Sequence, residues 1–64
     1  MEMQTLMNVL QQSMKDKRGV TFFLNGHSVA GIVTKTDLEF VEAKSQTYSK
    51  ILIRLDQILA VAIA

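Results

Sequence analysis

The chain has 64 residues, carries seven lysine and arginine against six acidic side chains, and contains no cysteine. Disulfides and thiolate metal sites are therefore excluded, and one histidine does not make a zinc site within one chain. A chain this short buries only about 60% of its unfolded surface, so a hydrophobic content of 48% favours assembly with further copies.

The N-terminal part predicts one amphipathic helix over residues 4–17, because its apolar residues recur at helical spacing. These residues are Met3, Leu6, Met7, Leu10 and Met14. Lys15, Lys17 and Arg18 follow at the end of this segment, where positive charge opposes the helix dipole. Gly19 is the predicted helix stop.

From Val20 onward the hydrophobic period changes to two, which is typical of strands. Strands are predicted at about 20–24, 28–36, 38–44, 48–55 and 58–63. Asn25-Gly26 predicts a two-residue hairpin of type I′, in which both residues have positive φ. Gly31 indicates a bend or bulge, and Asp37 indicates a turn that ends the second strand. We therefore predict a mainly β domain over 1–64, an N-terminal helix followed by a five-stranded, strongly bent antiparallel barrel.

The C-terminal segment 58–64 is apolar on both faces of its predicted strand. Strands of this kind are covered on both sides, and an uncovered one at a sheet edge favours aggregation. We therefore expect this segment at a boundary between identical subunits. The predicted interface residues are Ile51, Ile53, Ile58, Leu59, Val61 and Ile63.

Catalysis and membrane insertion are not expected. His27 has no obvious orienting partner, and a strand that places Asp37 and Glu39 on one face turns Glu42 to the other. We expect no catalytic residue, no cofactor and no metal site. The N-terminus shows no basic-then-apolar leader, and no apolar run approaches the roughly 20 residues of a membrane span. The expected location is the cytoplasm, with no membrane partner.

Two short patterns stand at a characteristic distance from one another. Gly26 is followed by Gly31 five residues on and by Asp37 six residues after that, and Ile53–Val61 reads apolar-Arg-x-x-x-Ile-x-x-apolar. With the order helix then five strands, these patterns resemble the Sm-like (LSm/Hfq-type) family of RNA-binding proteins. The family's second motif has a glycine where this chain has Leu55. The resemblance implies an SH3-like barrel.

The resemblance further implies a homo-oligomeric ring that binds single-stranded, often uridine-rich, RNA in RNA metabolism or as an RNA chaperone. In that family the fourth strand of one subunit pairs with the fifth of the next. The family's uridine-contacting positions are Glu39, Val41 and Arg54 here, and of these only Arg54 matches. Asp37 belongs to the first motif. A second RNA surface in the family corresponds to Phe22, Asn25, Gly26 and His27.

Each of these residues also has a structural interpretation. Strand geometry places either Phe22 or Phe23 in the core. Arg54 pairs with Asp56 or with a neighbouring subunit, Asp37 is a turn residue, and His27 is a solvated turn residue. The rival function is a structural or protein-binding ring that has lost the uridine pocket, because a carboxylate and an aliphatic side chain occupy two pocket positions.

Overall fold

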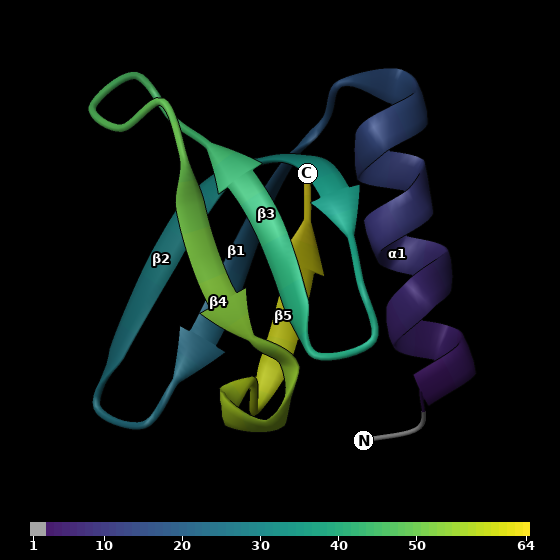
Figure 1. Ribbon diagram of the computed structural model, residues 1–64, viewed down its shortest axis with the longest axis vertical. Helices are drawn as coiled ribbons and strands as arrows, with labels where there is room; N and C mark the ends of the chain where they lie inside the picture. The colour runs from purple at the N-terminus through teal and green to yellow at the C-terminus, as the bar shows by residue number, and fades with distance from the viewer. Residues whose placement is uncertain (1–2) are drawn as a thin grey trace.

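The computed structural model describes residues 3–64; the predicted domain also includes residues 1–2, which lie outside the described residues. Its elements are α1 (Met3–Asp16), β1 (Gly19–Leu24), β2 (His27–Thr36), β3 (Phe40–Lys44), β4 (Ile51–Arg54), the 3-10 helix η1 (Leu55–Gln57) and β5 (Ala60–Ile63). The strands form one antiparallel sheet in the order β4-β3-β2-β1-β5 (Figure 1). The predicted mainly β fold with an N-terminal helix is confirmed.

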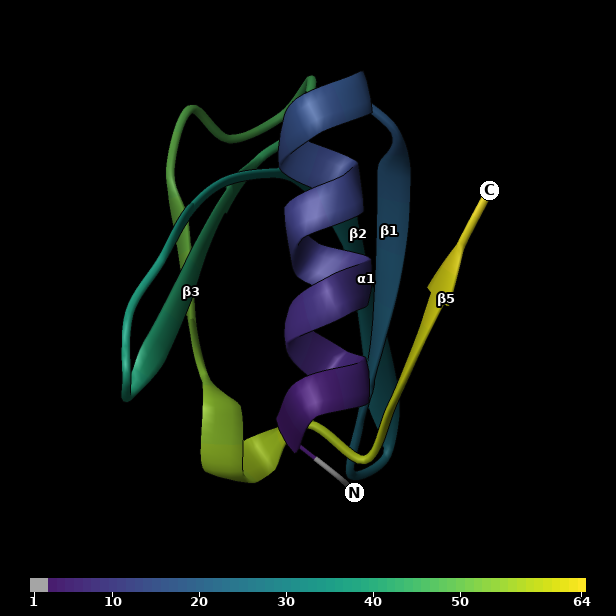
Figure 2. The same ribbon diagram turned by 90° about the vertical axis from the view of Figure 1, so that its right-hand side faces the viewer.

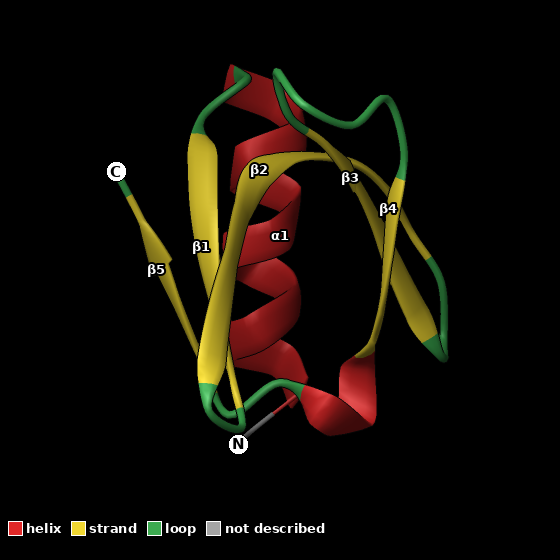
Figure 3. Cartoon of the chain, turned by 90° about the vertical axis from the view of Figure 1, so that its left-hand side faces the viewer, coloured by secondary structure: helices red, strands yellow, loops and turns green. Residues whose placement is uncertain are grey.

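The sheet folds over on itself without closing. β2 curves so that β1 and β5 lie on one side of the molecule and β3 and β4 on the other (Figure 3). Helix α1 lies across one open side between these halves (Figure 2). β4 and β5 are the two end strands and do not pair with each other, so the prediction of a closed barrel is corrected to an open, bent sheet.

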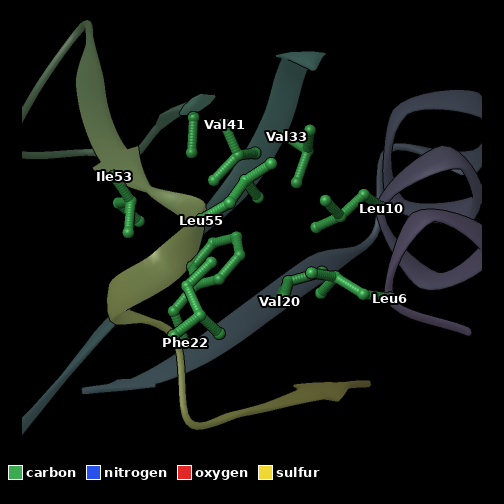
Figure 4. Packing of buried hydrophobic residues seen from close by; sticks show 10 residues of the cluster. Leu6, Leu10, Val20, Phe22, Val33, Val41, Ile53 and Leu55 are labelled. Atoms are coloured by element: carbon green, nitrogen blue, oxygen red, sulfur yellow. The ribbon is translucent and has the colours of Figure 1, made fainter. Parts of the chain in front are cut away.

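The core lies between the two halves of the sheet and the helix (Figure 4). Its buried members are Leu6, Leu10, Val20, Phe22, Val33, Val41, Ala43, Ile53, Leu55 and Ile58. Helix residues supply one side of this cluster and alternating strand residues the other, as the two hydrophobic periods predict. The partly buried Met7 and Met14 pack against the cluster, so two of the methionines are packing residues.

The helix ends at Asp16, and its left-handed capping residue lies two positions before the predicted glycine stop. Lys17 takes the left-handed conformation with φ of 58°, and the Arg18 N–H donates to the Ser13 carbonyl at 3.1 Å. This bond between the sixth and first residues of the motif is the defining contact of a Schellman C-cap. Gly19 instead begins β1, so the prediction that Gly19 stops the helix is wrong.

The predicted hairpin is present, but its turn type differs. Leu24 pairs with His27 across a two-residue turn. Gly26 has φ of 85°, whereas Asn25 does not take a positive φ. A positive φ at the second central residue alone is the pattern of a type II turn, so the type I′ prediction is corrected.

Gly31 is required for a reason other than a bulge. The register shift lies between Val33 and Lys35. A Cβ at position 31 would stand 2.7 Å from the Lys44 carbonyl oxygen of β3. Glycine therefore allows β2 and β3 to approach closely at the bend.

Replacing Gly31 with alanine is expected to lower the free energy of unfolding by about 2 kcal/mol, because backbone atoms must move to make room. Gly19→Ala is the matched control, since a Cβ there meets nothing within 4 Å. We expect Gly19→Ala to change stability by less than about 1 kcal/mol. Urea unfolding followed by circular dichroism measures the stability of both variants. An equal loss of stability in the two would contradict the close approach of β2 and β3 at Gly31.

The second half of the chain is less regular than predicted. Residues 45–50 form a loop, in which the Ser45 hydroxyl oxygen accepts the Thr47 and Tyr48 N–H groups at 3.2 and 3.1 Å. β4 is consequently shorter than the predicted strand 48–55, and the unpredicted η1 follows it. β3 begins at Phe40 rather than residue 38, because residues 37–39 form the preceding turn.

β5 is partly covered by its own subunit. It pairs with β1, and Val61 and Ile63 pack against the core near α1. Ala60, Ala62 and Ala64 are exposed on the alternate positions. The expectation that a neighbouring copy must shield this segment is therefore corrected for β5, in which Val61 and Ile63 turn inward and the alanines outward.

Candidate functional site

Two turns far apart in the sequence meet at one end of the molecule. The Leu55 N–H donates to the Glu39 carbonyl at 2.9 Å, which joins the β2–β3 turn to the start of η1. Within the first turn the Asp37 N–H donates to the Phe40 carbonyl at 2.9 Å. The Asp37 Oδ1 accepts the Leu38 N–H at 2.6 Å, so the structural interpretation of Asp37 as a turn residue is confirmed.

Arg54 and Asp56 form an ion pair beside this junction. Arg54 Nη2 lies 2.9 Å from Asp56 Oδ2, and both side chains are exposed. An exposed pair of this kind contributes at most about 1 kcal/mol to stability. A guanidinium has five N–H donors, so this one bond to Asp56 leaves Arg54 able to reach a further anion or a planar ring.

Phe40 is the aromatic residue that is paired with Arg54 across β3 and β4. The two residues are directly opposite each other on β3 and β4, and the Phe40 side chain is 39% exposed. Phe40 also lines a shallow hollow of about 120 Å³. The other lining residues are Lys35, Thr36, Asp37, Glu42 and Leu52. Apolar and polar side chains therefore line the same hollow.

Phe40 was not among the residues selected from the sequence. The signal was present in the alternation of β3, where Val41 and Ala43 point inward and are fully buried. Phe40 must then lie on the outer face, as Glu42 and Lys44 do. The family spacing directed attention to Glu39 and Val41 instead.

Glu39 and Val41 differ in their exposure to solvent. Val41 is a core residue with no exposed surface, so it is not available to a ligand. Glu39 is exposed and lines a second hollow of about 210 Å³ with Met3, Leu38, Arg54, Leu55 and Asp56. Of the three uridine-contacting positions, only Glu39 and Arg54 reach the surface.

The second RNA surface expected from the family is altered in the same way. Phe22 is fully buried and is the largest such side chain, so its predicted RNA contact is corrected to a core role. Phe23 is the exposed ring, at 43% of its surface, and is opposite Ser28. Asn25, Gly26 and His27 are exposed at the hairpin tip.

The predicted interface residues divide into three groups. Ile53 and Ile58 are buried in their own subunit, so their side chains have almost no surface to bring to a partner and this prediction is corrected. Ile51, Val61 and Ile63 are half-buried. Leu59 is the exposed member of the set. It follows η1, and its N–H donates to the Phe23 carbonyl at 2.8 Å.

Residues 3–64 contain no group of three metal-ligating side chains of the kind that holds an ion. No helix in that part of the chain has the length and hydrophobicity needed to cross a bilayer. No protein-family model and no curated protein matches the sequence.

Proposed function

We propose that this chain binds single-stranded RNA without catalysis, as a subunit of a homo-oligomeric ring of Sm-like type. The observation that carries the proposal is the pairing of a partly exposed aromatic ring, Phe40, with Arg54 across two strands. Unpaired bases stack on aromatic faces at about 1–3 kcal/mol each. An adjacent guanidinium suits phosphate or a second planar base.

The charges near Arg54 indicate how such binding is driven. Asp37, Glu39 and Asp56 belong to the same two turns, and the whole chain has a formal charge of only +1. Phosphate attraction is therefore weak, and stacking supplies most of the affinity. Each phosphate contact to single-stranded RNA contributes a salt slope of about −0.7, so the slope here is shallow.

Assembly into a ring is supported by the two ends of the sheet. β4 and β5 each pair with a neighbour on one side only, and each spans four residues. Pairing of β4 in one copy with β5 in the next satisfies both edges. Such a head-to-tail contact is heterologous, and it closes into a ring when the rotation between copies permits.

A protein-binding ring is the second candidate. Leu38 is 90% exposed at the tip of the β2–β3 turn, with an exposed carboxylate on each side. An exposed large apolar side chain with charged neighbours suits contact with a basic, partly apolar protein segment. This candidate predicts that the chain has no measurable affinity for RNA.

Titration of fluorescein-labelled nonamer RNAs with the protein, followed by anisotropy, tests the RNA proposal. Phe40→Ala is expected to weaken binding about tenfold, which is the loss of one stacked base. Tyr48→Ala is the matched control, because it removes an exposed aromatic from the β3–β4 loop. Binding that is weaker than about 10⁻⁴ M at low salt would overturn the proposal.

The assembly has its own measurement. Native mass spectrometry of the full chain should give a single closed subunit number, and Arg54→Ala should leave that number unchanged while RNA affinity falls. A monomer across micromolar concentrations would overturn the ring. Loss of the ring in Arg54→Ala would assign Arg54 to the subunit contact instead of to RNA.

A further inference from the structure

The two carboxylates that line the hollow beside Phe40 differ in how many of their oxygens already have hydrogen-bond partners. Glu42 is already engaged, since Thr34 Oγ1 lies 3.0 Å from its Oε2 and Lys50 Nζ lies 3.8 Å from its Oε1. Asp37 is engaged through Oδ1 alone, which accepts the Leu38 N–H. Its Oδ2 has no partner among the described contacts of this residue, and its Oδ1 has a second lone pair that can accept another hydrogen bond. A ligand in the hollow therefore meets a carboxylate that has acceptor capacity to spare.

A carboxylate distinguishes the four bases because it only accepts hydrogen bonds. Uracil presents one N–H between two carbonyl oxygens, which a carboxylate repels. Cytosine and adenine present an amino group next to a ring nitrogen acceptor. Guanine alone presents two adjacent donors, N1–H and the 2-amino group, which match the two oxygens of a carboxylate as an arginine fork does.

Other contacts in the hollow fit the same base. Phe40 and Leu52 are apolar lining residues of the hollow, and the Phe40 ring offers a face on which a purine can stack. Lys35 also lines the hollow, and its ammonium group is a donor that suits the guanine O6 or the adjoining phosphate. Val41, at the position where the family carries the amide that reads uracil, is buried and offers nothing to the base edge.

We propose that the Phe40 hollow selects guanine over uracil in single-stranded RNA, with Asp37 accepting hydrogen bonds from guanine N1 and N2. This inference rests on the proposed RNA-binding function and adds a base specificity to that site. It differs from the uridine preference that the family resemblance implies. The difference follows from a carboxylate with spare acceptor capacity beside the stacking ring.

Three labelled nonamers test the proposal on the unaltered protein: all uridine, uridine with one central guanosine, and uridine with one central inosine. The guanosine RNA is expected to bind about tenfold more tightly than the uridine RNA, as a bidentate base contact predicts. Inosine keeps N1–H but lacks the 2-amino group, so it should lose most of that gain. Equal binding of the uridine and guanosine RNAs would overturn the inference.

Asp37→Asn tests the residue assignment. The amide keeps an oxygen for the Leu38 N–H and adds a donor that suits uracil O4. The guanosine and uridine RNAs should therefore bind this variant with about equal affinity. Asp16→Asn is the matched control, because it removes one exposed negative charge at the end of α1. It should raise all three affinities equally. An unchanged preference in a folded Asp37→Asn protein would overturn the assignment.

The RNA-binding function and the guanine preference are overturned by different results. If none of the three RNAs binds, the RNA-binding function itself is overturned. If they bind but the uridine RNA is preferred, the function stands and the guanine inference is wrong. If Asp37→Asn does not fold, the comparison of guanosine with inosine on the unaltered protein still decides the base preference.

Discussion

Phe22→Ala is expected to lower the free energy of unfolding by about 3–5 kcal/mol. Phe22 is the largest fully buried side chain, and Figure 4 shows its ring within the core cluster. Truncation removes its burial and leaves a cavity that the surrounding strands only partly fill. At about 0.05–0.15 kcal/mol per residue a domain of this size has little stability to lose, so the variant should be largely unfolded at 25 °C.

Phe23→Ala is the matched control for that experiment, because it removes the same group from the next residue, where the ring is partly exposed. We expect it to cost about 1 kcal/mol or less. Urea unfolding followed by circular dichroism measures both variants. If Phe22→Ala stays as stable as Phe23→Ala while RNA affinity is lost, Phe22 is a ligand contact and the core assignment is wrong.

Ser13→Ala is expected to destabilise the protein by about 2–4 kcal/mol. The fully buried Ser13 hydroxyl donates to the Arg18 carbonyl at 2.6 Å and accepts the Val33 N–H at 3.1 Å. Alanine leaves the buried Val33 N–H unsatisfied, which costs about 1–3 kcal/mol, and removes the part-buried hydrogen bond to the Arg18 carbonyl, which contributes about 1 kcal/mol. The melting temperature should fall by at least about 8 °C.

Ser28→Ala is the matched control, because Ser28 is exposed on β2. This substitution should change the free energy of unfolding by no more than about 0.5 kcal/mol. Amide hydrogen exchange gives a second, local measurement. The Val33 amide should lose protection in Ser13→Ala by more than the amides of β1 do. Unchanged stability would show that water or another group replaces the hydroxyl.

The importance of Ser13 was not visible in the sequence. A serine inside an amphipathic helix is a weak helix former, and its presence alone does not indicate a role in tertiary packing. Its value comes from β2, where the register shifts just after Val33. The hydroxyl joins the end of α1 to the sheet at this shift, a contact between residues 20 positions apart. No local pattern reports such a pairing.

The sequence patterns predict only part of the candidate site. The motif spacing points to Asp37 and Arg54, and the structure joins their turns through the bond between Leu55 and Glu39. The family positions, which are counted along the chain from Asp37, do not include Phe40. The side-chain direction of Phe40 instead follows from where β3 begins and which of its residues face the core.

Local chemistry was enough to predict the helix, the hairpin at Asn25-Gly26 and the turn at Asp37, because each depends on residues that are neighbours along the chain. Long-range packing was needed to place Phe22 inside and Phe23 outside, to bring the Lys44 carbonyl against Gly31, and to leave the sheet open between β4 and β5. Alternation puts Phe22 on one strand face with Val20 and Leu24, and Phe23 on the other face with Thr21. Contact with the helix and with the opposite half of the sheet then determines which of the two faces is buried.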